Sequence, residues 1–83
     1  MTQGEKMDWK FETAGPTGEC RAFGVNLFKY PWRDCRETAI VADPRHGAEK
    51  VFHVYEVEID GVVRRFAGGE FSNGVFGVYL PAD

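Results

Sequence analysis

Four side chains in this sequence could bind a transition metal: Cys20, Cys35, His46 and His53. Thiolates and imidazoles are ligands that zinc prefers in proteins. Their spacing is C-x14-C-x10-H-x6-H, whereas zinc sites bring at least two ligands together through a short spacing within one turn. The pattern therefore does not favour a metal site, and we expect no metal and no other cofactor.

The same thiols and histidines could form a nucleophile and its base. However, the sequence contains no G-x-S-x-G, H-E-x-x-H or G-x-x-x-x-G-K-[ST] motif, the patterns that present a nucleophile, a zinc ion or a phosphate. Glu56 and Glu58 share one face of an expected strand, but Glu56 is expected to face Arg65 as an ordinary cross-strand ion pair. We therefore expect no catalytic residues and no enzyme activity.

Aromatic and positively charged side chains alternate between Phe28 and Arg36. Tyr, Trp and Arg dominate the residues that contribute most to protein binding, and Pro31 both fixes its own φ and biases the preceding residue toward an extended conformation. We predict that a partner is bound by Tyr30, Trp32, Arg33 and Arg36. The partner would be another protein, of unknown identity, or a second copy of this chain. The alternative is that Trp32 covers one end of the core while Arg33 pairs with an acid.

Single-stranded nucleic acid is the second partner class that this stretch allows, because small β-domains stack bases on aromatic side chains flanked by cations. Arg21 and Arg45 would widen the basic patch. Against this, the formal net charge is -3 and the pI is about 5.3, whereas domains that bind phosphate backbones are usually basic. We therefore rank nucleic acid behind a protein partner.

A chain of 83 residues is long enough for one domain only. Its 43% hydrophobic content and 12 aromatic residues (7 Phe, 2 Trp and 3 Tyr) predict a folded chain, stabilised by aromatic burial. We expect a flexible tail over residues 1–7 and a single β-rich domain over residues 8–83. No apolar run is long enough to span a membrane and the N-terminus lacks an apolar signal-peptide core, so we expect a cytoplasmic protein, with no membrane contact and with reduced cysteines.

The strongest structural signal lies in two β-forming runs, Val51–Ile59 and Val62–Ala67, on either side of Asp60–Gly61. An Asp-Gly pair suits a two-residue type I′ turn, in which both residues need a positive φ. That turn predicts the cross-strand pairs Ile59 with Val62, Glu58 with Val63, Val57 with Arg64, Glu56 with Arg65 and Tyr55 with Phe66. The core face of this hairpin would carry Tyr55, Val57, Ile59, Val62 and Phe66, with Arg64 reaching water at its rim.

Asn73–Gly74 predicts a second tight hairpin by the same reasoning. Counting outward from this turn pairs Ser72 with Val75, Phe71 with Phe76, Gly69 with Val78 and Gly68 with Tyr79. Phe66 and Phe71 differ in parity, so we expect the strand to change its buried face at Gly68–Gly69, where a bulge or bend is easiest.

The first half of the chain is less regular. We predict strands at Trp9–Thr13 and Cys20–Tyr30, a loop over Ala14–Gly18 and a turn over Asp43–Gly47. Residues 31–42 fit either a strand from Glu37 to Ala42 or a helix, and the β-branched residues favour the strand.

The predicted fold is therefore mainly β: a small antiparallel meander of about five strands rolled into a barrel or bent sheet. The alternative is an α+β fold with one short helix near residues 32–42. Exposed edges at Trp9–Thr13 or Val75–Leu80 would offer a further route to a partner, by addition of a strand to the sheet.

Overall fold

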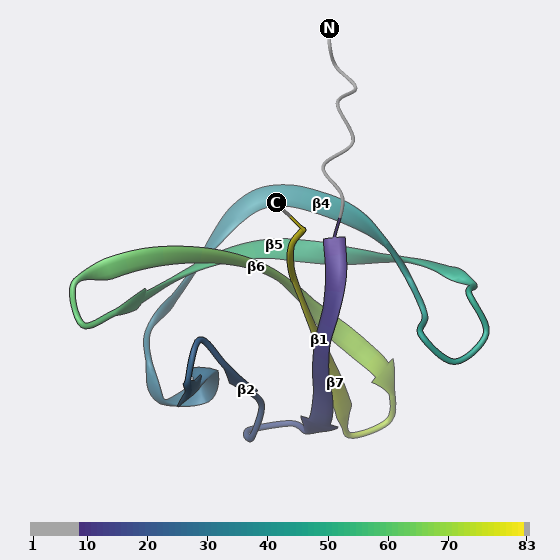
Figure 1. Ribbon diagram of the computed structural model, residues 1–83, viewed down its shortest axis with the longest axis horizontal. Helices are drawn as coiled ribbons and strands as arrows, with labels where there is room; N and C mark the ends of the chain where they lie inside the picture. The colour runs from purple at the N-terminus through teal and green to yellow at the C-terminus, as the bar shows by residue number, and fades with distance from the viewer. Residues whose placement is uncertain (1–8, 83) are drawn as a thin grey trace, which may run out of the picture.

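The computed structural model describes residues 9–82, so the predicted tail over residues 1–7 lies outside the described residues. One antiparallel sheet of five strands, in the order β1-β7-β6-β5-β4, dominates these residues, and β2 and β3 form a separate small ladder (Figure 1). The elements are β1 (Trp9–Pro16), β2 (Arg21–Ala22), β3 (Val25–Asn26), the 3-10 helix η1 (Leu27–Lys29), β4 (Trp32–Ala42), β5 (Glu49–Ile59), β6 (Val62–Ser72) and β7 (Val75–Pro81).

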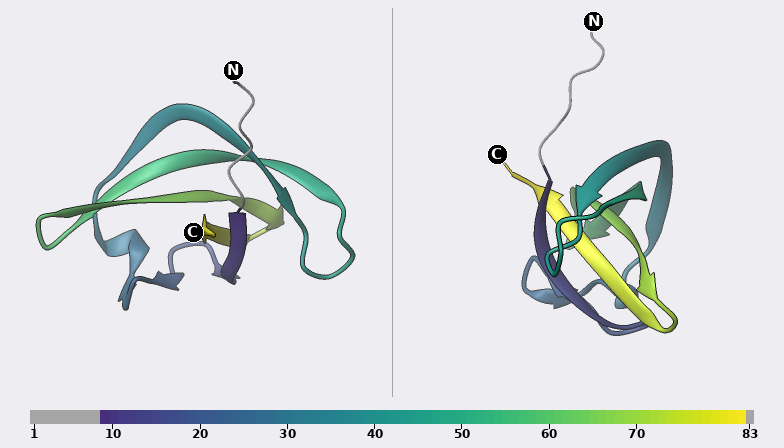
Figure 2. Two further views of the ribbon diagram at one scale, coloured as in Figure 1. Left: turned by 45° about the horizontal axis from the view of Figure 1, so that its top comes forward. Right: turned by 90° about the vertical axis from the view of Figure 1, so that its right-hand side faces the viewer.

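The prediction of a mainly β fold is confirmed, and the sheet is bent rather than closed into a barrel. Its two edge strands, β1 and β4, approach each other without forming a ladder. The strands curl along their length, as the two views of Figure 2 show. Val75–Leu80 lies within β7, which pairs with both β1 and β6, so the prediction that it forms an exposed edge is wrong.

The sheet buries apolar side chains on both of its faces, but in different places. We call the cluster covered by the segment from β2 to η1 the first core; it comprises Cys20, Ala22, Leu27, Val57, Ile59, Phe66 and Val78. The second core comprises Ala39, Val41, Phe52, Val54, Ala67 and Tyr79. Consecutive residues of a strand point to opposite faces, so the neighbours Phe66 and Ala67 belong to different cores, as do Val78 and Tyr79.

Two glycines allow aromatic rings of the second core to lie directly on the strand backbone. A Cβ atom at Gly69 would lie 2.6 Å from Cδ1 of Phe52, and one at Gly77 would lie 2.6 Å from Cε2 of Phe71. Both distances are too short for non-bonded carbon atoms, so a side chain at either position would displace a ring. The sheet can therefore bend tightly around this core because these positions lack side chains.

The β5–β6 hairpin has the predicted register, and all five predicted cross-strand pairs are observed. Asp60 has φ 51° and Gly61 has φ 81°, as a type I′ turn requires. One detail is wrong: Val62 is 49% exposed rather than part of the core, because the tip of the hairpin extends past the segment that covers the first core (Figure 1). Arg64 lies with its guanidinium carbon 5.4 Å from the centre of the Phe23 ring.

The β6–β7 hairpin has the predicted turn but not the predicted register. Ser72 pairs with Val75, but the next pair is Glu70 with Phe76, so the bulge lies at Phe71 rather than at Gly68–Gly69. Gly74 has a φ of 79°, whereas Asn73 does not adopt a positive φ. This turn is therefore not type I′. The unpaired residue Phe71 forms a bulge, and the bulge adds the local twist that lets the two strands pair across a turn of another type. As a result Tyr79 pairs with Ala67, not with Gly68.

Two predictions for the first half of the chain are wrong. The loop expected from Ala14 begins later, because β1 continues to Pro16. Residues 20–30 do not form one strand: Phe23 and Gly24, with φ of 55° and 81°, form a turn between β2 and β3. The Asn26 side chain then accepts a hydrogen bond of 3.0 Å from the backbone N–H of Phe28 and caps η1.

The ambiguous segment over residues 31–42 is a strand, and the alternative of a helix near residues 32–42 is wrong. β4 is longer than the predicted strand from Glu37 to Ala42, because it begins at Trp32 and continues through a bulge. Asp34 pairs with Tyr55 and Glu37 with Val54, so Cys35 and Arg36 have no partner in the ladder. The turn over Asp43–Gly47 is confirmed by a hydrogen bond of 2.7 Å from the Gly47 N–H to the Asp43 carbonyl oxygen.

We predict that Gly69→Ala lowers the free energy of unfolding by about 1–3 kcal/mol, because the new methyl group overlaps the Phe52 ring. Urea unfolding of the single variant, of Phe52→Leu and of the double variant measures the effect and its coupling. The smaller Leu side chain should recover part of the loss. Equal stability of Gly69→Ala and the wild type would contradict the close contact between ring and backbone.

Candidate functional site

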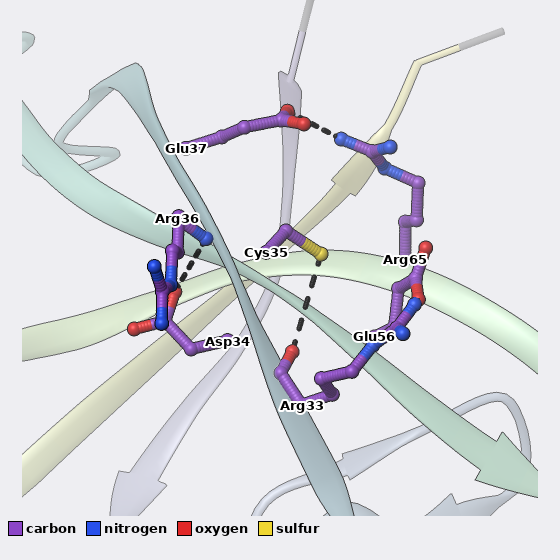
Figure 3. A pocket seen from close by; sticks show the side chains of 7 residues that line it. All are labelled: Arg33, Asp34, Cys35, Arg36, Glu37, Glu56 and Arg65. Carbon is purple, nitrogen blue, oxygen red and sulfur yellow. Dashed lines mark hydrogen bonds and ion pairs between the residues drawn. The ribbon is translucent and has the colours of Figure 1, made fainter.

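An open hollow of about 340 Å³ lies at the bulge of β4, on the side of the sheet opposite the first core. Glu56 follows Val54 by two residues and Arg65 precedes Ala67 by two, so both share the face of the second core. The hollow is lined by Arg33, Asp34, Cys35, Arg36, Glu37, Glu56 and Arg65 (Figure 3).

Two ion pairs hold the walls of this hollow across three strands. Arg33 of β4 pairs with Glu56 of β5, and Nη2 of Arg65 on β6 lies 2.7 Å from Oε1 of Glu37 on β4. Hydrogen bonding to Glu56 raises the pKa of Arg33. The predicted opposition of Glu56 and Arg65 is present in the register, but each of these residues pairs with a residue of β4 instead, because the bulge brings both Arg33 and Glu37 within reach.

The bulge itself is fixed by a local hydrogen bond. The backbone N–H of Arg36 donates to Oδ1 of Asp34 at 2.8 Å. Arg36 has a φ of 61°, in the left-handed region that favours glycine. Its side chain is exposed and forms no ion pair with any of residues 9–82.

Cys35 lies in the middle of the hollow with its thiol toward the side chains that line it (Figure 3). Partial burial and the nearby carboxylate of Glu56 raise the pKa of Cys35, although Arg65 and Arg33 oppose this. A thiol with a raised pKa is protonated near neutral pH and is a poor nucleophile. The surroundings of Cys35 therefore do not activate its thiol.

The structure divides the four predicted partner-binding residues between two faces of the sheet. Tyr30 and Trp32 pack against the first core, whereas Arg33 and Arg36 line the hollow. Alternation along β4 separates Trp32 from Arg33, and the bulge at Cys35 and Arg36 interrupts that alternation, so Arg36 lines the hollow as well. The sequence analysis named two residues of the hollow, Arg33 and Arg36, because of their residue type. It did not predict the pair of Glu37 and Arg65, because only the folded sheet brings these two residues together.

Trp32 makes extensive contacts in the first core. Its ring centre lies 4.8 Å from that of Phe28 and 4.9 Å from that of Phe66, and the rings of Tyr55 and Phe76 are also close. The indole N–H donates to the carbonyl oxygen of Leu27 at 2.9 Å. Trp32 therefore fixes β4 against the core directly beside Arg33.

A second ionic cluster occupies the turn between β4 and β5. Asp43 is only 1% exposed, and its carboxylate accepts hydrogen bonds from the backbone N–H, Nε and Nη2 of Arg45 at 2.8, 3.1 and 3.0 Å. Nε2 of His46 lies 3.5 Å from Oδ2 of the same carboxylate. The Arg45 guanidinium also lies 5.5 Å from the centre of the Phe71 ring. Arg45 thus fastens the turn to the second core, and its charge is neutralised.

An apolar pair is exposed on β4 and β5 beside this turn. Ile40 and Val51 face each other across the ladder and are 57% and 65% exposed. Thr38 and His53 form the neighbouring exposed pair on the same face. Nothing in the residue types indicates this exposure, because Ile and Val in a strand are ordinarily assigned to a core.

Within residues 9–82 no group of three or more His, Cys, Asp or Glu side chains is placed to hold a metal ion. No helix in that range is long and apolar enough to cross a bilayer. A scan against protein-family models finds no match, and searches of curated proteins and of solved structures find no similar protein.

We predict that the two thiols react at very different rates and do not form a disulfide with each other. Cys20 is buried in the first core and Cys35 packs beside the second core, on the other face of the sheet. A thiol reagent at pH 8 should modify one cysteine, Cys35, in the native protein and the second only after unfolding. A native protein that forms an intramolecular disulfide under mild oxidation would contradict this arrangement.

We predict that Asp43 makes stability decline in acid. Hydrogen bonds from the Arg45 side chain and backbone hold the pKa of Asp43 well below its ordinary value. A lowered pKa stabilises the fold above the unfolded-state pKa of about 3.9, and this contribution is lost as the pH falls through the folded-state pKa. Asp43→Asn should therefore be less stable than the wild type at pH 7, and the difference should shrink toward pH 2. Urea midpoints across this range that fall in parallel for both proteins would contradict the prediction.

Proposed function

We propose that this protein is a non-catalytic protein-interaction module, an adaptor, small inhibitor or homodimer, that acts by occupying a surface of its partner. The observation that carries the proposal is the hollow at the β4 bulge. It contains Arg33 and Arg36, and it lies on an edge strand that Trp32 fixes from the opposite face. Two ion pairs, Arg33 with Glu56 and Arg65 with Glu37, order part of this polar surface before a partner arrives, which lowers the entropic cost of association.

The charges of the hollow favour a protein over a nucleic acid. Its lining contains three arginines and three acids, so the formal charges cancel. Interfaces between proteins commonly combine charges of both signs at a polar rim, whereas binding of a phosphate backbone requires an excess of cations. The exposed pair Ile40 and Val51 adds apolar surface of the kind that a protein partner covers.

Single-stranded nucleic acid remains the alternative, with weaker support. Phe28, Tyr30 and Trp32 pack against the first core, which limits the ring faces open to stacking. Arg33 and Arg45 are already paired with Glu56 and Asp43. We place the module in the cytoplasm, as the thiols and the sequence suggest, and we assign it no cofactor.

We predict that Arg33→Ala and Arg36→Ala each weaken partner binding by about tenfold or more, if these side chains form the centre of the contact. Alanine at position 36 retains the same backbone strain, so this variant isolates the loss of the side chain. Tagged protein would be used to recover the partner from the source cell, and the affinity of the purified partner would be measured by calorimetry. Lys29→Ala, an exposed cation outside the hollow, is the matched control.

Two outcomes would count against this function. One is that both arginine variants, folded normally, bind the partner as tightly as the wild type and the Lys29→Ala control. The other is tight binding of single-stranded oligonucleotides that weakens steeply with salt, which would instead support the nucleic-acid alternative.

A further inference from the structure

The charges of β4 are arranged symmetrically about Cys35. The segment reads Arg33-Asp34-Cys35-Arg36-Glu37, and when it is read in reverse every charged position has the opposite sign. If two copies of this segment run antiparallel about Cys35, Arg33 therefore opposes Glu37 and Asp34 opposes Arg36, and each of these pairs occurs twice. A two-fold symmetric contact between identical chains requires a surface that complements itself in this way.

Asp34 and Arg36 carry charges that the fold leaves without a counter-ion. Both side chains are exposed, and neither forms an ion pair with any of residues 9–82. Figure 3 shows the two together on one side of β4, away from Glu37 and Arg65. Oδ1 of Asp34 accepts from the backbone N–H of Arg36, so Oδ2 is left to accept from a guanidinium outside the chain. A second copy supplies that guanidinium and offers the matching carboxylate in return.

Arg33 and Glu37 can join this contact without giving up the partners that they have. The Arg33 side chain is 76% exposed beside Glu56, and the Glu37 side chain is 54% exposed beside Arg65. Arg33 donates to Glu56 through Nη2, and Glu37 accepts from Arg65 through Oε1. A guanidinium has five N–H donors and a carboxylate has two oxygens, so each side chain can bind a residue of the second copy as well.

The position of β4 leaves the segment accessible. β4 pairs with β5 on one side, and no strand within residues 9–82 forms a ladder on its other side. The bulge at Cys35 and Arg36 interrupts the strand and works against a continuous ladder with another chain. The contact is therefore made by side chains rather than by addition of a strand.

The same symmetry brings apolar surface to the contact. Tyr30 and Ile40 lie five residues on either side of Cys35, and Tyr30 is already extended, with φ −125° and ψ 156°. Antiparallel copies therefore bring Tyr30 of one toward Ile40 of the other. Ile40 is 57% exposed, and this contact removes apolar surface from water.

We propose that the protein forms a two-fold symmetric homodimer through residues 30–40, in which Asp34 of each copy pairs with Arg36 of the other. This inference rests on the proposed interaction function and names a second copy of the chain as the partner. Exposed ion pairs contribute little individually, and a contact of this size lies at the low end of specific interfaces. We therefore expect a dissociation constant in the micromolar to millimolar range.

The test is the oligomeric state of two charge-reversal variants, alone and mixed, measured by sedimentation equilibrium from micromolar to millimolar concentration. The wild type should pass from monomer to dimer. Arg36→Glu and Asp34→Lys should each raise the dissociation constant at least tenfold, because like charges then face each other across the two-fold axis. An equimolar mixture of the two variants should form a heterodimer, because every opposed pair again has unlike charges.

Two further variants control for charge and for folding. Lys10→Glu, at an exposed position on β1, makes the same change of charge as Arg36→Glu and should dimerise like the wild type. Asp34→Lys removes the acceptor of the Arg36 N–H as well as the charge. Asp34→Asn keeps an oxygen acceptor there, so it should weaken the dimer several-fold without lowering the thermal midpoint in dilute solution. If Asp34→Lys does not fold, Asp34→Asn and Arg36→Glu decide the test.

The register has its own readout, because Cys35 lies on the proposed axis. A short bis-maleimide, which joins two accessible thiols, should link two wild-type chains at concentrations where the dimer forms. Cys35→Ser should yield no covalent dimer, since Cys20 is buried. A dimer that cannot be linked through Cys35 would refute the antiparallel register.

A wild type that stays monomeric at millimolar concentration would overturn the inference. So would a dimer that Arg36→Glu weakens no more than Lys10→Glu, or a mixture that associates no better than either variant alone. The proposed function is tested separately by the captured partner. A different protein that loses affinity with Arg33→Ala and Arg36→Ala, while the purified chain stays monomeric, would leave the interaction function standing and refute only the second copy. If neither capture nor self-association depends on these arginines, the proposed function fails as well.

Discussion

The structure depends on the need to bury apolar side chains on both faces of one thin sheet. The chain has 83 residues, and a chain of this length buries a smaller share of its surface on folding than a larger domain does. The strands therefore curl, so that one half of the sheet packs against the segment from β2 to η1 and the other half closes around Phe52 and Tyr79. Each half leaves its reverse face to solvent. The charged hollow lies on one of these reverse faces, behind the ring of Phe66.

This arrangement couples the packing of Trp32 to the position of Arg33, its neighbour in β4. The indole ring is fixed by four aromatic neighbours and by its hydrogen bond to Leu27. The next side chain must then point away from the core, where it meets Glu56 on β5. Trp32 packs into the core and Arg33 carries a charge on the opposite face. Aromatic and basic residues alternate here because the two faces of the strand have different surroundings.

Parts of this fold could be predicted because a short local signal determined them. Asp60 and Gly61 both adopt the positive φ that their residue types favour, and the whole β5–β6 register follows from that turn. The Asn73–Gly74 turn has the same appearance in the sequence, but only its glycine has a positive φ, and the bulge at Phe71 shifts every later pair. The hollow could not be predicted from a local signal. The sequence shows that arginines are present, but the ion pairs that line the hollow join residues of three strands, and their positions depend on a bulge at Cys35 and Arg36.

The central structural claim is that adjacent residues of β6, Phe66 and Ala67, belong to different cores on opposite faces of the sheet. Nuclear Overhauser contacts from these two side chains test it most directly. The Phe66 ring should contact Trp32 and Leu27, whereas the Ala67 methyl group should contact Phe52 and Tyr79. Contacts from both side chains to one shared set of residues, or an Ala67 methyl group in contact only with water, would contradict the two-core sheet and the position of the hollow that it creates.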